Sequence, residues 1–424
     1  MDPLLTQMRR IAGNRLWDAG LWAVAIVCLV RLALALPERA HRIDLAHYYT
    51  SSRLLIETGH PYGTDLTQLY QRYGFIVPED IRQATNPPSL LWLFVPFVLL
   101  TPGQAFVAWA AVQALALGAI LWQTKRLLRD RLSPRAWRFL FLGILISHPI
   151  YWHFLMSQSQ LLSAALVLTA YAWQQEDKHW RAILAVMVTG FLKIFPLILL
   201  PWFIWRSDTH WRGRLNRALV ATAVGLALVG LTGWRLWVDF YREGVPVLSF
   251  WALHSWNFTL PSFVIELTSI STGSAAVGWL WAGLISGLGV ITAAYAACWR
   301  GKQDAEVEFS LLCVAMLLGS LVTWGHYLVF LFFPVAVWVA RLTAQPTSGK
   351  LFYCALTLVL LSIGAHRHPF LFAHPYLRVL VNWSPMYGLF AMGVALAREL
   401  NAPAPAGSTS SAEADGRSDK RLDF

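Results

Sequence analysis

Residues 42–62, RIDLAHYYTSSRLLIETGHPY, form the most polar and aromatic run in the N-terminal part of the chain. Asp44 is the first carboxylate of this run and stands a few residues beyond the first apolar segment. Tyrosines follow it, and the run closes with a Gly-His-Pro-Tyr turn. Carboxylate and imidazole groups often exchange protons with substrates. We therefore interpret the run as a candidate site rather than a plain connection.

The composition is typical of a polytopic helical membrane protein. Of the 424 residues, 57% are hydrophobic and 13% are charged, and the mean hydropathy is +0.49. Ordinary soluble domains are less apolar. Apolar runs of about twenty residues, the length that spans a bilayer as a helix, recur along the chain. The sequence thus predicts an all-α integral membrane protein.

The net charge of +11 admits two interpretations, nucleic-acid binding or membrane topology. Lys and Arg in a membrane protein mark cytoplasmic loops, so we favour topology. The four cysteines lie in or at the edge of apolar runs. They have neither zinc-ligand spacing nor the pattern of a disulfide framework, so we interpret them as small apolar residues.

Topology follows from the first apolar run, residues 19–36, which lacks a small-residue cleavage pattern. Arg9, Arg10 and Arg15 precede it and place the N-terminus in the cytoplasm. Asp44 then emerges on the extracytoplasmic side. The same rule predicts about twelve spans with both ends inside, from the apolar runs 19–36, 103–123, 137–154, 157–173, 180–205, 218–233, 276–298, 309–323, 327–340, 351–365 and 382–397, and the shorter run 89–100.

These runs divide the chain into a cytoplasmic N-terminus, a transmembrane domain and a disordered cytoplasmic tail rich in Ala, Pro, Ser and charges. The predicted bounds are 1–18, 19–400 and 401–424. The transmembrane domain has two large extracytoplasmic loops, at 37–103 and 234–275. We expect the first loop to contain helices that lie along the membrane.

Two of the apolar runs do not form simple spans. Residues 89–100 are too short to cross ~30 Å of hydrocarbon at a rise of about 1.5 Å per residue, so we predict a re-entrant or interfacial helix. Residues 180–205, as one helix, would place Arg206 and the next arginines outside, against the positive-inside rule. We therefore predict a break at Lys193, just before Phe195-Pro196, that leaves Lys193 near the outer turn.

The polar residues of the predicted spans and outer loops gather on one side of the membrane. No Asp or Glu lies deep in a predicted span, whereas proton-coupled transporters usually need an ionisable group near the midplane. This distribution indicates an extracytoplasmic site at the membrane boundary. The residues on this side are Asp44, His47, Tyr48, Tyr49, His60, His153, Gln158, Lys193, His254, Asn257, His326 and His366.

Several short motifs occur in a fixed order along residues 21–340. They are Asp44-x3-Tyr48, Gly59, Pro61-Tyr62, Pro87-Pro88, Ser157-Gln158-Ser159-Gln160, Gly190-x2-Lys193-x2-Pro196, an outer-loop Asn, and Trp324-x-His326 before Pro334. In these motifs and their order the chain resembles the GT-C superfamily of polyprenyl-phosphate-sugar-dependent glycosyltransferases, most closely glycosyltransferase family 87. It departs from the family pattern where Ser157 replaces a Gly, where Tyr327 replaces a second His, and where Asn257-Phe258-Thr259 replaces Asn-x-Ser.

The resemblance implies a GT-C-like fold and transfer of a sugar, often mannose, from a polyprenyl phosphate to a hydroxyl with inversion. An acceptor hydroxyl needs a base, and Asp44 is the candidate. Lys193 and His326 are the candidates that stabilise the developing phosphate charge. No cofactor or metal is expected, because no cluster with ligand spacing is present. The other candidate binding residues are Tyr48, Tyr49, His47, Gln158, His254, Asn257, Arg53 and Arg367.

Alternatives to this interpretation remain open. Asp44 could cap an interfacial helix, Lys193 could snorkel to the interface, and His326 could join two helices. A transporter or lipid flippase without covalent chemistry is the second hypothesis, and a non-catalytic membrane scaffold the third. The expected partners are the bilayer, the lipid-linked donor and a lipid or glycan acceptor, in a bacterial inner membrane.

Overall fold

The computed structural model describes residues 15–35, 43–77, 82–128, 131–207, 210–252, 257–272, 277–300, 304–363 and 383–401. Within these ranges every regular element is a helix, which confirms the predicted all-α class. The predicted terminal segments lie almost entirely outside them.

The described helices differ widely in length, and several adjoin a 3-10 or π segment, labelled η. In chain order they are α2 (Arg15–Ala35), α3 (Ile43–Thr58), α4 (Thr67–Arg72), α5 (Pro88–Phe94), η2 (Val95–Leu99), α6 (Pro102–Leu128), α7 (Pro134–Ile146), α8 (His148–Met156), α9 (Gln160–Gln175), α10 (His179–Leu192), η3 (Phe195–Leu199), α11 (Leu200–Arg206), α12 (Trp211–Thr232), α13 (Trp234–Asp239), η4 (Phe240–Gly244), α14 (Val245–Ala252), α15 (Leu260–Thr272), α16 (Val277–Arg300), α17 (Ala305–Gly319), η5 (Gly325–Leu331), α18 (Phe332–Ala344), α19 (Ser348–Ile363) and α21 (Ser384–Asn401).

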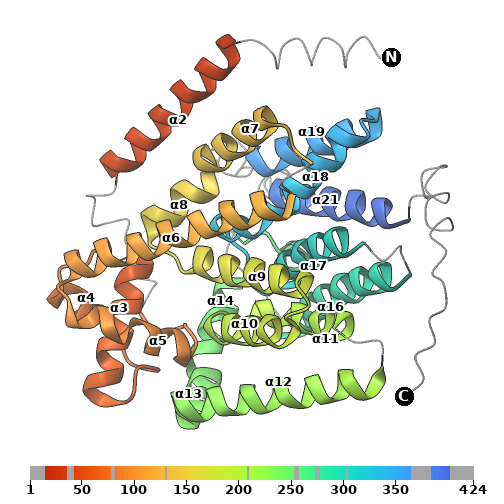
Figure 1. Cartoon of the computed structure of the whole chain (residues 1–424). Coiled ribbons are helices and arrows are strands. Elements are labelled where there is room, and N and C mark those ends of the chain that lie inside the picture. Colours follow the sequence, from red (N-terminus) through yellow and green to blue (C-terminus); the bar gives the residue numbers. More distant parts are fainter. Residues whose placement is uncertain are drawn as a thin grey trace, which may run out of the picture.

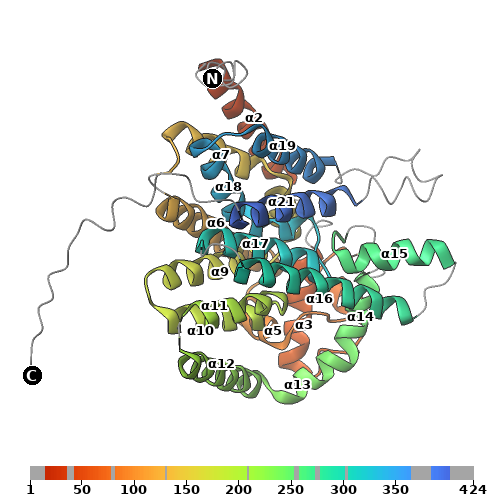
Figure 2. The same cartoon turned by 90° about the vertical axis from the view of Figure 1, so that its right-hand side faces the viewer.

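The longer helices form a stack of roughly parallel rows, with α2 at the top and α12 at the bottom in both views (Figures 1 and 2). The short helices α3, α4 and α5 lie together at the left end of the stack in Figure 1. We call this the α3–α5 end. The outermost helices, α2 and α12, carry many exposed apolar side chains, as expected of surfaces that face lipid.

Four helices of the described residues are long and apolar enough to cross a membrane: Pro102–Leu128, Trp211–Thr232, Trp281–Arg300 and Gly325–Ala344. The pair α7 and α8, bent by 42° at its junction, is a fifth candidate if it forms one span. Multi-pass membrane character is therefore confirmed, whereas the predicted number of about twelve spans is not. Many apolar runs form helices shorter than a bilayer is thick, because 3-10 segments and prolines interrupt them.

The break predicted at Lys193 is one of these interruptions. The helix α10 ends at Leu192, Lys193 has an extended backbone (φ −147°, ψ 109°), and η3 begins at Phe195 with Pro196 in its first turn. Proline has no N–H to continue the hydrogen bonds of a helix, and its ring clashes with the preceding turn. The stretch is therefore two short helices, as the arrangement of arginines suggested.

Gly190 allows η3 to fold back onto α10. A Cβ atom at Gly190 would lie 2.3 Å from both Cγ and Cδ2 of Leu197. Any side chain at this position would thus push Leu197, and η3 with it, away from α10. The spacing Gly190-x2-Lys193-x2-Pro196 has a structural explanation: the glycine admits the returning segment and the proline begins it.

The turn between α8 and α9 has an unusual backbone at Ser157. This residue has φ 61° and ψ 44°, the left-handed conformation that glycine adopts most easily. Its carbonyl oxygen accepts a hydrogen bond of 2.9 Å from Trp109 Nε1 on α6, which fixes the turn. The Gly that the family pattern has at this position would adopt the same conformation without strain.

Aromatic packing attaches α3 to the membrane helices. The Tyr48 ring lies 4.9 Å from the ring of Phe94, which in turn lies 4.6 Å from Trp109. All three side chains are fully buried, and the contact therefore links α3 through α5 to α6. The carboxylate of Asp44, one helical turn before Tyr48, is placed by this contact.

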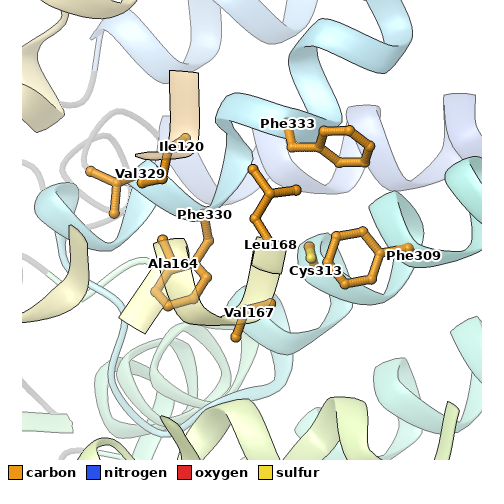
Figure 3. A pocket seen from close by; sticks show the side chains of 9 residues that line it. All are labelled: Ile120, Ala164, Val167, Leu168, Phe309, Cys313, Val329, Phe330 and Phe333. Carbon is orange, nitrogen blue, oxygen red and sulfur yellow. The ribbon is translucent and has the colours of Figure 1, made fainter. Parts of the chain in front are cut away.

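The main core is apolar and lies away from α3. Figure 3 shows a small pocket in this core, whose lining side chains come from α6, α9, α17, η5 and α18. The pocket is lined by Ile120, Ala164, Val167, Leu168, Phe309, Cys313, Val329, Phe330 and Phe333.

The core also contains a paired carboxylate. Glu308, in the first turn of α17, accepts hydrogen bonds from Trp202 Nε1 (2.8 Å) and Arg206 Nη2 (2.6 Å) of α11. This buried carboxylate is thus a structural group.

We expect Gly190→Ala to destabilise the protein by about 1–3 kcal/mol, the usual cost of overpacking. Gly118→Ala in α6 is the matched control, because a Cβ atom there meets nothing within 4 Å and alanine favours a helix interior by about 0.5–1 kcal/mol. Thermal unfolding in detergent, followed by tryptophan fluorescence, measures both. Equal midpoints for the two variants would contradict the packing explanation.

Ser157→Gly should raise the unfolding temperature and Ser157→Val should lower it. Glycine removes a left-handed strain of about 1–2 kcal/mol, more than the roughly 0.4–1 kcal/mol by which it stabilises the unfolded chain. Glycine also removes a buried hydroxyl that has no hydrogen-bond partner in the described structure. A β-branched residue fits this backbone worst. The same unfolding assay tests the order, and a valine variant as stable as wild type would refute it.

Candidate active site

Gln158 connects two predicted site residues of α3. Its side-chain Nε2 donates a hydrogen bond to Asp44 Oδ2, and its Oε1 accepts one of 3.2 Å from the Tyr48 hydroxyl. Ser159 Oγ lies 3.4 Å from the same hydroxyl. The turn fixed by Ser157 therefore places one amide between a carboxylate and a phenol.

Lys193 reaches this group from the break after α10. Its Nζ donates a hydrogen bond of 3.1 Å to Asn86 Oδ1 and lies 5.5 Å from the centre of the Tyr48 ring. That distance is within the range of cation–π attraction. The charges of Lys193 and Asp44 interact electrostatically. However, no nitrogen–oxygen distance between these two described residues is within the 4.0 Å of an ion pair.

Asn86 is not among the predicted site residues. Only Pro87-Pro88, which follow it, belong to the family resemblance, and α5 begins at Pro88. The side chain of Asn86 is buried, with 6% of its surface exposed. Its contact with Lys193 spans 107 residues of sequence, so no local pattern could have revealed it.

Two predicted loop residues hold the segment that carries Asn86. The Tyr62 hydroxyl, at the end of the Gly-His-Pro-Tyr turn, donates a 2.7 Å hydrogen bond to the Asn86 carbonyl oxygen. His47 Nε2 accepts a 3.2 Å hydrogen bond from the Thr85 backbone N–H. Its Nδ1 must therefore carry the proton and donate to the Tyr70 hydroxyl, 3.0 Å away. Both ring nitrogens of His47 are thus bonded within the protein.

Burial shifts the proton equilibria of α3, which lies outside the candidate spans. It raises the pKa of Asp44 above its ordinary value, and the charge of Lys193 and the hydrogen bond from Gln158 only partly oppose the rise. Burial, together with Lys193, lowers the pKa of His47 to about 4, so this imidazole is neutral at pH 7. Burial and the Asp44 charge raise the pKa of Tyr48 well above its ordinary value. Asp44 is thus the group of α3 best suited to take up a proton near neutral pH.

Two buried histidines lie close enough to Lys193 to interact with its charge. His326 lies in η5, with its ring 4.9 Å from that of Tyr327, and His153 lies in α8. Both interact electrostatically with Lys193. In the described structure, neither ring nitrogen of His153 nor Nε2 of His326 has a hydrogen-bond partner. Such buried, unsatisfied groups are costly and call for a ligand or water. His153 had been noted only as one of the polar residues on this side.

Other predicted binding residues are placed elsewhere. The Tyr49 hydroxyl donates a hydrogen bond of 2.9 Å to the Leu100 carbonyl oxygen. Arg53 pairs with Glu57 at the surface, 2.6 Å away. Asn257 donates to the Leu321 carbonyl and accepts from the Thr323 N–H, both at 2.7 Å, and so supports the turn before η5. His254 and Arg367 lie outside the described residues.

The structure thus brings together Asp44, Tyr48, Gln158, Lys193 and His326 from four separate segments. It combines a proton acceptor, a cation and several neutral hydrogen-bonding groups. Within the described residues, no three His, Cys, Asp or Glu side chains lie close enough to hold a metal ion.

Comparison with known proteins identifies the family of the chain. No curated protein matches the chain. A family model described as glycosyltransferase family 87 matches residues 84–323, more than half of the chain. The matched region includes Asn86, Gln158 and Lys193, while Asp44 and His326 lie on either side of it. The protein therefore belongs to glycosyltransferase family 87, a GT-C type family of membrane glycosyltransferases.

Proposed function

We propose that the protein transfers a hexose, with mannose as the first candidate, from a polyprenyl phosphate to a hydroxyl of a lipid or envelope glycan. The observation that carries this proposal is the partly buried carboxylate of Asp44, which interacts electrostatically with the ammonium of Lys193 and is bridged to Tyr48 by Gln158. A proton acceptor and a fixed cation are what hydroxyl attack on a phosphate-linked sugar requires. Membership of family 87 supports glycosyl transfer over the transporter and flippase alternative.

In the proposed reaction, Asp44 takes the proton of the acceptor hydroxyl. At the same time, the oxygen of that hydroxyl forms a bond to the anomeric carbon of the donor sugar. The bond between that carbon and the phosphate oxygen breaks, and its electron pair stays on the phosphate. This single displacement inverts the anomeric configuration. One carboxylate suffices because the phosphate leaves as an anion and needs no strong acid, unlike the leaving group in glycoside hydrolysis.

Negative charge moves from Asp44 to the lipid phosphate in this step. The carboxylate becomes neutral, and the phosphodiester, with one negative charge, becomes a monoester with two. We propose that Lys193 and His326 stabilise this charge, because fixed cations and donors act most strongly where charge develops in a buried site. Tyr48 and Gln158 would hold sugar hydroxyls. The roles predicted for Tyr49, His47, Asn257, Arg53, His254 and Arg367 remain part of the proposal.

We also propose that the α3–α5 end faces the extracytoplasmic side of a bacterial inner membrane. The helix α6 ends in Lys125 and Arg126 at the opposite end of the stack, where α12 begins with Arg212 and Arg214 (Figure 1). Such residues favour the cytoplasm. The full topology would have about twelve spans, with loops 37–103 and 234–275 outside and both termini inside.

Asp44→Asn should abolish sugar transfer while leaving the protein folded, because the amide keeps the shape but cannot accept the proton. The assay uses proteoliposomes with radiolabelled polyprenyl-phosphate mannose and a membrane lipid extract. Asp65→Asn is the matched control, because Asp65 is an exposed carboxylate of the same loop whose Oδ1 accepts a 2.8 Å hydrogen bond from the Thr67 N–H. Transfer by Asp44→Asn at the wild-type rate would exclude Asp44 as the base.

The rate should depend on pH through the same carboxylate. Since a base must be ionised, kcat/KM rises as the pH rises through the pKa of Asp44. Because burial raises that pKa, the acid limb should lie above about pH 4, the ordinary range of a carboxyl group. Initial rates across pH, with donor binding measured alongside, test this. A rate that stays constant down to about pH 4 would contradict it.

A further inference from the structure

Asn86 gives Lys193 an uncharged partner where a charged one is nearby. The amide oxygen accepts a hydrogen bond of 3.1 Å from the ammonium. The carboxylate of Asp44 attracts the same ammonium but stays beyond the 4.0 Å of an ion pair. An amide oxygen solvates a cation without cancelling its charge, whereas a carboxylate would cancel it.

The position of Asn86 is itself strongly constrained. Tyr62 binds its carbonyl oxygen, and His47 binds Thr85 through both the backbone N–H and, at 3.1 Å, the Oγ1 hydroxyl. Gly244 of the η4 segment packs against the carbonyl of Ala84, where a Cβ atom would come within 3.3 Å. Three parts of the structure thus hold the short loop from which the Asn86 side chain reaches Lys193.

Without the hydrogen bond to Asn86, the Lys193 ammonium would be stabilised most by direct contact with Asp44. A charge that is removed from water favours the nearest opposite charge, because its desolvation is costly. Contact with Asp44 would lower the pKa of the carboxylate and weaken it as a base. It would also neutralise the cation that the leaving phosphate needs.

We propose that Asn86 is a positioning residue that holds the Lys193 ammonium apart from Asp44, so that the base stays basic and the cation stays available to an anion. This rests on the proposed function, in which Asp44 takes up the acceptor proton. The titratable groups that surround the pair are His47 and Tyr48 on α3, Tyr70 on α4, His153 on α8, and His326 and Tyr327 on η5.

Two substitutions at Asn86 have opposite expected effects on the pH profile. In Asn86→Ala, Lys193 moves onto Asp44, so kcat falls and the acid limb shifts to lower pH by about one to three units, the usual effect of an adjacent opposite charge. In Asn86→Asp, a second carboxylate opposes ionisation of Asp44 and pairs with Lys193. The acid limb then shifts to higher pH, and KM for the donor rises.

The test is the pH dependence of kcat and KM for both variants in proteoliposomes, with thermal unfolding as the measure of folding. Asn216→Ala, at an exposed position of α12, is the matched control and should keep the wild-type profile. In a Lys193→Met background, Asn86→Ala should cause no further shift, because the two residues act through one contact.

A loss of kcat in Asn86→Ala with an unshifted acid limb would overturn the proposal and leave a merely structural role. Shifts of the two variants in the same direction would also overturn it. If Asn86→Ala does not fold, Asn86→Asp decides by the sign of its shift alone. Failure of the proposed function is recognised separately, because wild type would then transfer no sugar or Asp44→Asn would remain active.

Discussion

A single ammonium group, that of Lys193, imposes the strongest constraint on this structure. Moving such a charge out of water costs several kcal/mol unless other groups solvate it. The chain meets this cost with an amide oxygen, an aromatic ring and a carboxylate at a distance. The amide belongs to the loop before α5, and the ring and the carboxylate both belong to α3. The break after α10, the loop before α5 and the helix α3 thus meet at this one cation.

The same constraint gives a role to the hydrogen bonds that hold the segment around Asn86. Within the described structure, Tyr62, His47 and Tyr70 form no hydrogen bond with Lys193 or Asp44, yet their hydrogen bonds determine where Asn86 lies. Sites of this kind need supporting contacts, because an error of about 1 Å in a catalytic group lowers rates severely. These hydrogen bonds therefore hold the loop that carries Asn86 in place against its neighbours.

The sequence predicted the features that follow from local rules. The order of apolar helices, the break at Lys193 and the short helix at Pro88 came from hydropathy, from the positive-inside rule and from proline. It could not reveal which polar side chains are already satisfied. Tyr49 and Asn257 are bonded to backbone groups that are distant in sequence, and Asn86 lies opposite Lys193 for the same long-range reason. The number of spans was equally beyond local rules, because bends and 3-10 segments shorten the helices.

The orientation of the Gln158 amide has a consequence for the acceptor. Since Oδ2 of Asp44 already accepts the amide N–H, Oδ1 is the oxygen with more lone pairs open to a substrate proton. An acceptor sugar with several hydroxyls would then have to present one of them from the side of Oδ1. In the proposed reaction, regioselectivity is therefore set by the protein through a single amide, before any contact with the rest of the acceptor.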